Sequence, residues 1–426
     1  MRNRFAWLAV VSVLALVAVG CRGDNTGTDT DGGDDPCAAD EHGCVEYGPN
    51  DPIMLGTLLV ISGENASLGQ DSQNGAVLAL DFRDTPGEVL GHPVEFNHQD
   101  DGCSAEGGQA GAQALASDPT IAAVIGTSCS SAALGVADTI LSEQGIVLIS
   151  PSNTGPALTA PETHQPFYLR TAHNDKIQGG AVADFAYNEA GKRKAATIHD
   201  GSPYADGLQQ VFADNFTRLG GEITAQQAIQ VGETDFGPVL TDIAADQPDF
   251  LYFPVFVAEG GLLTQQARET SGLENTDLGG SDGMFTPDWI EAAGDAAEGV
   301  YISGPDLSAF AGGDFYKNEF LPAYEEKFGE KPQSVFHAHA FDATNMILDA
   351  IEQVAIEGED GGLQIPRQEL RDALFNTQGF EGITGTLSCD ENGDCQQIAV
   401  MAIHQVKDGD FGDAIFSKEY NLAELG

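Results

Sequence analysis

Two short segments rich in hydroxyl side chains each follow an apolar run in the sequence. Residues 127–130 (Thr-Ser-Cys-Ser) follow the run at 121–125, and residues 150–154 (Ser-Pro-Ser-Asn-Thr) follow the run at 146–149. If both runs are parallel strands, the two turns meet at the sheet edge where open α/β folds bind ligands. Helical spacing after the first turn would place Ser130 and Ser131 at the positive end of a helix dipole. The pattern predicts a site for a small anion or carboxylate, with ordinary N-capping by these serines as the alternative.

Other groups of reactive residues favour structural roles. Residues 390–394 (DENGD) alternate acids like a calcium loop, but Asn-Gly between strand-like runs and flanking cysteines indicates a hairpin turn. His337 and His339 point to different faces of an expected helix, so we do not expect them to share a metal. The sequence contains no H-E-x-x-H or P-loop pattern. We therefore expect no enzyme activity, no cofactor and no metal site.

The elements around the two turns alternate between strand and helix patterns. Strands are expected at 55–61, 94–97, 121–125 and 146–149, with helices at 70–82 and 105–116 between them. The alternation restarts at 194 and continues to 280. Helices are also expected at 315–328, 334–356 and 366–376. They should pack against a sheet, and the simplest arrangement is that they cover the first one. A late strand is expected at 401–406.

This order predicts an α/β fold with two doubly wound parallel-sheet lobes. The first lobe would comprise residues 53–172 and 304–396, and the second residues 173–303 and 397–426. The chain then crosses between the lobes three times, which predicts a three-strand hinge.

The first residues predict export. Arg2 and Arg4 precede an apolar stretch at 5–19 that is too short for a membrane-spanning helix and is typical of a signal peptide, residues 1–20. The stretch ends in Ala-Val-Gly-Cys, which resembles a lipoprotein signal, so we expect Cys21 to be lipidated; a signal peptide cut elsewhere is the alternative. Residues 21–52 are rich in Gly, Asp and Thr and predict an acidic tether. We therefore expect a periplasmic protein that is anchored to a membrane through the lipid on Cys21.

The cysteine count predicts disulfides, and the net charge limits the classes of binding partner. Six cysteines remain after Cys21, and an even number in an exported protein predicts disulfides. Cys37 lies near Cys44 and Cys389 near Cys395, which leaves Cys103 and Cys129, although six cysteines allow fifteen connectivities. A net charge of −48 from 66 acidic and 18 basic residues excludes nucleic acid and anionic lipid surfaces as favoured partners.

The chain also resembles a known family. The residues that carry the resemblance are spread over 53–412 and are most numerous between 56 and 171. They include Gly69, Asn74-Gly75-Ala76, Asp100-Asp101-Gly102-Cys103, Val124-Ile125-Gly126, Cys129-Ser130-Ser131, Ile149-Ser150-Pro151, Thr154, Pro156, Leu158 and Thr159. Together they resemble the leucine/isoleucine/valine-binding proteins, type I periplasmic binding proteins that deliver solutes to ABC importers.

The resemblance implies roles for particular residues. Ser130 and Thr154 would hold an amino acid's carboxylate, while the Ser152 carbonyl, the Thr154 hydroxyl and Asp282 would receive its α-ammonium. Tyr204 would close over the ligand, and a disulfide between Cys103 and Cys129 would hold the loop that presents Ser130.

Three departures from the family pattern affect this assignment. Leu68 replaces a common aromatic residue, Phe256 lacks a hydroxyl, and Asp282 is one methylene shorter than the usual Glu. With Phe336, the first two would form an apolar side pocket. The alternatives are that Phe256 and Phe336 belong to the core and that Asp282 is a surface turn residue.

The expected function is an exported receptor that captures a small apolar amino acid, branched-chain above all, or a related carboxylate. It would present the closed form to the membrane subunits of an ABC importer. The alternative is an envelope lipoprotein that uses the same fold for ligand sensing or protein interaction without transport.

Overall fold

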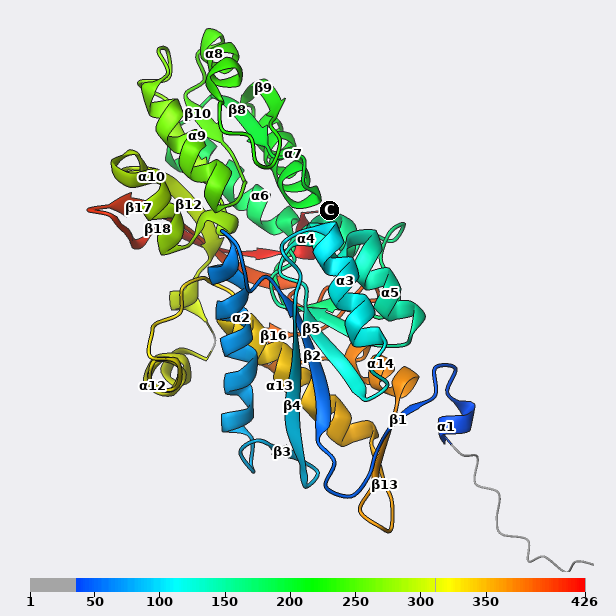
Figure 1. Cartoon of the computed structure of the whole chain (residues 1–426). Helices are drawn as coiled ribbons and strands as arrows, with labels where there is room; N and C mark the ends of the chain where they lie inside the picture. The colour runs from blue at the N-terminus through cyan, green and yellow to red at the C-terminus, as the bar shows by residue number, and fades with distance from the viewer. Residues whose placement is uncertain (1–35, 311, 426) are drawn as a thin grey trace, which may run out of the picture. The chain divides into compact units, whose positions relative to one another are not determined.

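The structure is a computed structural model that describes residues 36–310 and 312–425 (Figure 1). The expected signal peptide, Cys21 and the first part of the expected tether lie outside the described residues. Within the described ranges, no helix has the length and apolar character needed to cross a membrane.

The first sheet has six strands in the order β3-β4-β2-β5-β6-β7. Five of them are parallel: β2 (Ile53–Leu59), β4 (His92–Asp100), β5 (Ile121–Gly126), β6 (Val147–Ser150) and β7 (Tyr168–Arg170). The short β3 (Glu88–Val89) pairs with β4 in the antiparallel direction. The strand order matches the doubly wound arrangement expected from the sequence.

Helices cover both faces of this sheet, which explains why its central strands are continuous apolar runs. On one face Ile125 packs in a cluster with Ile347 of α13 (His337–Val354). On the other face its neighbour Val124 packs with Leu115 of α3 (Ala105–Ala116). Figure 1 shows α2 (Ala66–Ala79) beside α13 on the first of these faces.

Helix α2 lies unusually close to its neighbours. A Cβ atom on Gly75 would lie 2.0 Å from the His337 carbonyl oxygen, and one on Gly69 would lie 1.9 Å from the Val60 carbonyl oxygen. Only glycine fits at both positions. This close packing brings Leu68 on α2 and Phe336, which precedes α13, to the same edge of the sheet.

The second sheet has seven strands in the order β18-β17-β12-β11-β10-β8-β9. Its parallel strands are β8 (Lys194–His199), β9 (Glu222–Ala228), β10 (Phe250–Tyr252), β11 (Asp277–Gly280) and β12 (Tyr301–Pro305). The helices of this part of the chain are α6 (Asp175–Asp184), α7 (Pro203–Arg218), α8 (Gly237–Ala245), α9 (Val257–Glu269) and α10 (Pro287–Ala293). Helices α6 and α10 and strand β12 were not expected from the sequence.

The chain passes between the two sheets three times. It leaves the first sheet after β7 and forms the parallel strands of the second, β8 to β12. It then returns to build α13 and α14 (Arg367–Phe375), which pack in the same cluster as the first sheet. The last crossing leads to the antiparallel strands β17 (Ile398–Lys407) and β18 (Asp410–Asn421). The hairpin β17–β18 is longer than the single expected strand, and its turn uses Asp408 and Gly409 at φ 53° and 75°, as two-residue hairpin turns require.

The tether prediction does not hold for residues 44–47. Strand β1 (Cys44–Tyr47) pairs with β14 (Leu363–Pro366), and Val45 and Tyr47 are buried. The Tyr47 hydroxyl donates a hydrogen bond of 2.6 Å to the Thr120 carbonyl. Two alternating inward side chains are enough to make this polar segment an edge strand of the folded protein.

The three disulfides join Cys37 to Cys44, Cys103 to Cys129 and Cys389 to Cys395. These are the pairings that proximity in sequence and the family resemblance indicate. The last pair closes the turn at residues 390–394, which supports the hairpin interpretation over a calcium loop.

Candidate functional site

The two hydroxyl-rich turns lie side by side at the carboxyl edge of the first sheet, because β5 and β6 pair in parallel with Ile125 opposite Ile149. Their polar groups hold one another. Ser150 Oγ donates to the Thr127 carbonyl at 2.7 Å, and Ser152 Oγ donates to the Ser128 carbonyl at 3.0 Å. Ser130 Oγ accepts a hydrogen bond from the Gly155 amide at 3.2 Å. The turns therefore form one rigid unit.

The expected helix after the first turn is wrong in one respect. Helix α4 contains only Ser130–Ala132, and the chain then departs from helical geometry at Leu134 (ψ 112°) and Gly135 (φ 70°) before α5 (Asp138–Glu143). Apolar residues at helical spacing could not reveal this break. The helix that begins at Ser130 is therefore too short for a long helix dipole, and the expected carboxylate would depend on hydroxyl and amide groups instead.

Ser131 does not belong to the site edge. Its hydroxyl donates to the Cys103 carbonyl at 3.0 Å, toward the disulfide that joins Cys103 to Cys129. Asp101 supports the same loop from below, because its carboxylate accepts the amides of Ser128 at 2.6 Å and Cys103 at 2.7 Å.

One small cavity brings together side chains from both sheets. Its volume is about 10 Å³. The residues that line it are Leu68, Ser128, Cys129, Ser130, Ser152, Tyr204, Phe256, Asp282, Gly283 and Phe336. All the ligand-binding residues expected from the sequence are among them except Thr154.

Thr154 lies in the wall behind this lining. Its side chain is 1% exposed, and its hydroxyl has no hydrogen-bond partner among the described residues. It lies near enough to the Asp175 carboxyl group to lower the pKa of that group against the larger, opposite effect of burial. The Thr154 carbonyl accepts the Asp175 amide at 2.9 Å. Thr154 therefore links the second turn to the start of α6.

The wall contributed by the second sheet is centred on Tyr204 at the start of α7. Its hydroxyl donates to Asp282 Oδ1 at 2.9 Å and lies 2.6 Å from Ser281 Oγ. The ring of Phe256 packs against it with centroids 5.2 Å apart. Asp282 is 3% exposed, so the interpretation of a surface turn residue is wrong.

Phe256 and Phe336 lie at the boundary between the cavity and the hydrophobic core. Both line the cavity, and both belong to a buried cluster that also contains Leu68 and Tyr204. The core alternative therefore describes their packing correctly but does not separate them from the site. Their role as ligand contacts stays a prediction.

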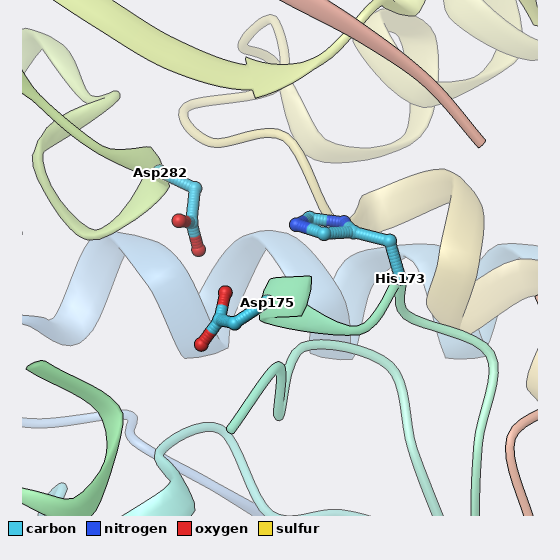
Figure 2. Close-up of side chains that lie close together, drawn as sticks. All are labelled: His173, Asp175 and Asp282. Carbon is cyan, nitrogen blue, oxygen red and sulfur yellow. The ribbon is translucent and has the colours of Figure 1, made fainter. Parts of the chain in front are cut away.

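Beside Asp282 lies a second buried carboxyl group, that of Asp175, which was not expected from the sequence. Asp175 begins α6. One of its carboxylate oxygens lies within 4.8 Å of a carboxylate oxygen of Asp282 and of a ring nitrogen of His173 (Figure 2). Burial, followed by the nearby charge of Asp282, raises the pKa of Asp175 well above its usual range. Burial likewise raises the pKa of Asp282. A usable signal was present, because Asn174 before Asp175 is an N-cap pattern, and its side chain accepts the Lys176 amide.

Arg170 was also not expected to contribute. Its side chain holds the second turn by hydrogen bonds to the backbone of that turn. Its side chain is completely buried, and its Nη1 donates to the carbonyls of Asn153 at 3.1 Å and Gly155 at 2.9 Å. Its Nε forms an ion pair with Asp394, in the turn closed by the last disulfide. Arg170 therefore holds the two residues that flank Thr154.

Burial raises the pKa of several other carboxyl groups, to about 7 for Asp101 and about 6 for Asp342. Their pKa in the unfolded chain is lower, so the folded protein binds more protons between about pH 4 and about pH 7. Stability contributed by these groups is present below that window and is lost as the pH rises through it. The pKa of Asp100 and of Asp306 is lowered instead. The stability that these two groups contribute is present at higher pH and is lost as the pH falls below about 4.

We therefore expect the ligand-free protein to have a higher free energy of unfolding at about pH 5 than at about pH 7.5. Urea denaturation at both pH values, with enough salt to screen the surface charge, measures the difference. Asp101→Asn should reduce the slope because an amide does not titrate, whereas the exposed Asp242→Asn should leave it unchanged. A protein that is more stable at the higher pH would contradict this expectation.

Comparison with known proteins identifies the family. The family model for periplasmic binding proteins matches residues 52–410. The Leu/Ile/Val-binding protein homolog 3 of Brucella melitensis is 27% identical over 347 residues, which cover 80% of this chain and 88% of that protein. The leucine-, isoleucine-, valine-, threonine-, and alanine-binding protein of Pseudomonas aeruginosa is 26% identical, with coverage of 84% and 91%.

A solved structure shows the same fold. The leucine binding protein LivK of Thermotoga maritima has a TM-score of 0.75 and 26% identity, and the match covers 87% of this chain and 99% of that one. The relatives are solute-binding proteins and not enzymes. From these matches and the paired sheets, the chain belongs to the periplasmic binding protein family.

Proposed function

We propose that this protein captures a small amino acid between the two sheets and delivers it to an ABC importer. The observation that carries the proposal is the opposition of two kinds of polar group across one cavity. Ser130 lines the first-sheet side of the cavity, with Thr154 buried behind it, and would hold a carboxylate together with the amides of the two turns, while Asp282 is buried on the second-sheet side. An α-amino acid carries the matching carboxylate and ammonium.

The buried acids favour a ligand with an ammonium group over a simple carboxylic acid. Relatives of this fold differ in this respect, since one structure holds isoleucine and another, from R. palustris, holds benzoate. Asp282, with Asp175 behind it, would repel an acid that brings no positive charge. No Lys or Arg lines the described cavity to offset that repulsion. We therefore favour amino acids over benzoate-like ligands.

The rest of the lining favours an apolar side chain on the ligand. Leu68, Phe256 and Phe336 supply aliphatic and aromatic surface beside the polar groups. A charged ligand side chain would lose its hydration there without a partner. Branched-chain amino acids therefore fit the proposal best.

Closure of two lobes around the ligand is the proposed mechanism. The first lobe would be residues 53–172 with 304–396, and the second residues 173–303 with 397–426. Tyr204 and Asp282 would meet the ligand only in the closed form, so ligand binding would shift the population toward closure. The proposed location is the periplasmic side of a membrane, with Cys21 as the lipid attachment.

Calorimetry on two alanine variants tests the ligand contacts. Ser130→Ala and Thr154→Ala are each expected to weaken binding of the preferred amino acid about tenfold or more, because each loses a buried hydrogen bond to a charged group. Ser131→Ala is the matched control, since that hydroxyl faces the Cys103 carbonyl. Unchanged affinity in both variants would remove the site assignment.

A thermal-shift screen with amino acids and organic acids finds the ligand first, because a bound ligand raises the melting temperature. No stabilisation by any of them would favour the alternative, an envelope lipoprotein without a transported solute.

A further inference from the structure

The carboxyl group of Asp175 is buried behind the cavity lining without a hydrogen-bond partner. The residue is 0% exposed, and neither of its carboxylate oxygens has a partner among the described residues. One of these oxygens lies within 4.8 Å of a carboxylate oxygen of Asp282, and Figure 2 shows the two groups turned toward each other. Two buried negative charges this close repel strongly, because little water is present to screen them. Two such acids are therefore not both ionised.

The groups around Asp175 do not supply a free positive charge. They come from five elements and are Arg170 in β7, His173 before α6, Tyr204 in α7, Tyr252 in β10 and Asp282 after β11. Burial lowers the pKa of His173 to about 4, so its ring is neutral near neutral pH. Burial raises the pKa of both tyrosines, so their hydroxyls are neutral as well. Arg170 is charged, but its guanidinium is paired with Asp394.

The hydroxyl of Thr154 is the acceptor that a protonated Asp175 would use. It is buried and also has no partner among the described residues. The Asp175 amide donates to the Thr154 carbonyl at 2.9 Å, and the hydroxyl lies near enough to the carboxyl group to affect its pKa. A protonated carboxyl group donates a hydrogen bond, and a hydroxyl that accepts it keeps its own hydrogen for another acceptor. An ionised Asp175 would instead draw that hydrogen toward itself and away from the ligand.

We propose that Asp175 takes up a proton from solvent when the site closes and then positions the Thr154 hydroxyl to donate to the ligand's carboxylate. This inference rests on the proposed function. In the closed form the negative charge lies on Asp282 alone, where it meets the ligand's ammonium. In the open form the ionised Asp175 adds to the repulsion of simple acids. Asp175 is therefore a positioning residue that acts through Thr154.

The direction of the pH dependence follows from the pKa of Asp175. In the closed site burial, followed by the charge of Asp282, raises this pKa well above its usual range. In the open form, where water reaches the carboxyl group, we expect the ordinary value of about 4. Closure therefore binds a proton at any pH between the two values, and ligand binding weakens as the pH rises through this window. The largest effect on the dissociation constant is about tenfold for each pH unit.

Calorimetry with L-leucine in two buffers that differ in ionisation enthalpy tests the proposal. Near neutral pH the parent protein should take up roughly one proton for each leucine bound, and its Kd should rise between about pH 6.5 and about pH 8. Leucine binding without proton uptake would overturn this inference and leave the proposed function standing. If leucine, isoleucine and valine all fail to bind, the proposed function falls and this inference falls with it.

Two substitutions of Asp175 separate its proton from its shape. Asp175→Asn keeps a donor that can reach Thr154 but does not titrate, so it should take up no proton and bind leucine at about pH 8 at least as tightly as the parent does. Asp175→Ala has no donor and should bind leucine about tenfold more weakly. The exposed Asp242→Asn should keep the proton uptake of the parent. Proton uptake that persists in Asp175→Asn would assign the proton to another group and overturn the proposal.

Infrared difference spectroscopy gives a readout that is independent of affinity. Leucine binding to the parent protein should produce the carbonyl band of a protonated carboxyl group, and Asp175→Asn should lack this band. Absence of the band from the leucine-saturated parent, or its presence in the variant, would overturn the proposal.

Discussion

Replacing Arg170 with methionine is expected to lower the free energy of unfolding by about 3–5 kcal/mol. The side chain is completely buried, and its removal leaves the Asp394 carboxylate without its ion-pair partner. It also leaves the carbonyls of Asn153 and Gly155 without the donors they have at 3.1 and 2.9 Å. Buried acceptors that lose their donors bear the full cost of desolvation. Denaturant unfolding of parent and variant measures the loss.

An exposed ion pair provides the matched control. Lys418 and Asp184 form one in which the lysine side chain is 53% exposed, so Lys418→Met should cost about 1 kcal/mol or less. The double variant Arg170→Met/Asp394→Asn should be less destabilised than the sum of the single variants, because no charge remains buried alone. A loss of about 1 kcal/mol or less for Arg170→Met would show that the buried pair does not anchor this turn.

Asp282→Asn is expected to weaken binding of the preferred amino acid about 100-fold, which corresponds to about 2.7 kcal/mol. Asparagine has nearly the same shape and can still accept the Tyr204 hydroxyl, now 2.9 Å from Asp282 Oδ1. The change therefore removes the negative charge and little else. A buried charge-assisted hydrogen bond to the ligand's ammonium contributes on this scale.

Two comparisons make the Asp282 test specific. The deaminated analogue of the ligand, which has the same side chain and carboxylate, should lose no affinity in Asp282→Asn because it has no ammonium. The exposed Asp242→Asn should bind the amino acid as the parent does. Calorimetry that finds the same loss for both ligands would assign Asp282 to the shape of the closed lobe and not to the ammonium.

The sequence by itself determined the fold class, and it predicted which residues gather at one edge of the first sheet. Alternating strand and helix patterns depend on local spacing, and the family resemblance rests on short motifs, so both can be read along the chain. The same reasoning located Ser130, Ser152, Tyr204 and Asp282, all of which line one cavity. The disulfide pairs that are close in sequence could also be predicted, because their spacing is visible along the chain.

Only the tertiary structure decided which polar groups are buried and what they meet. Arg170 and Asp175 look like ordinary charged residues in the sequence, because their partners Asp394 and Asp282 are distant along the chain. The break at Gly135 was hidden because its neighbours keep helical spacing, and β1 was hidden because its partner strand lies some three hundred residues later. Burial and long-range pairing depend on how the helices and strands pack against one another, and the local sequence pattern does not specify that packing.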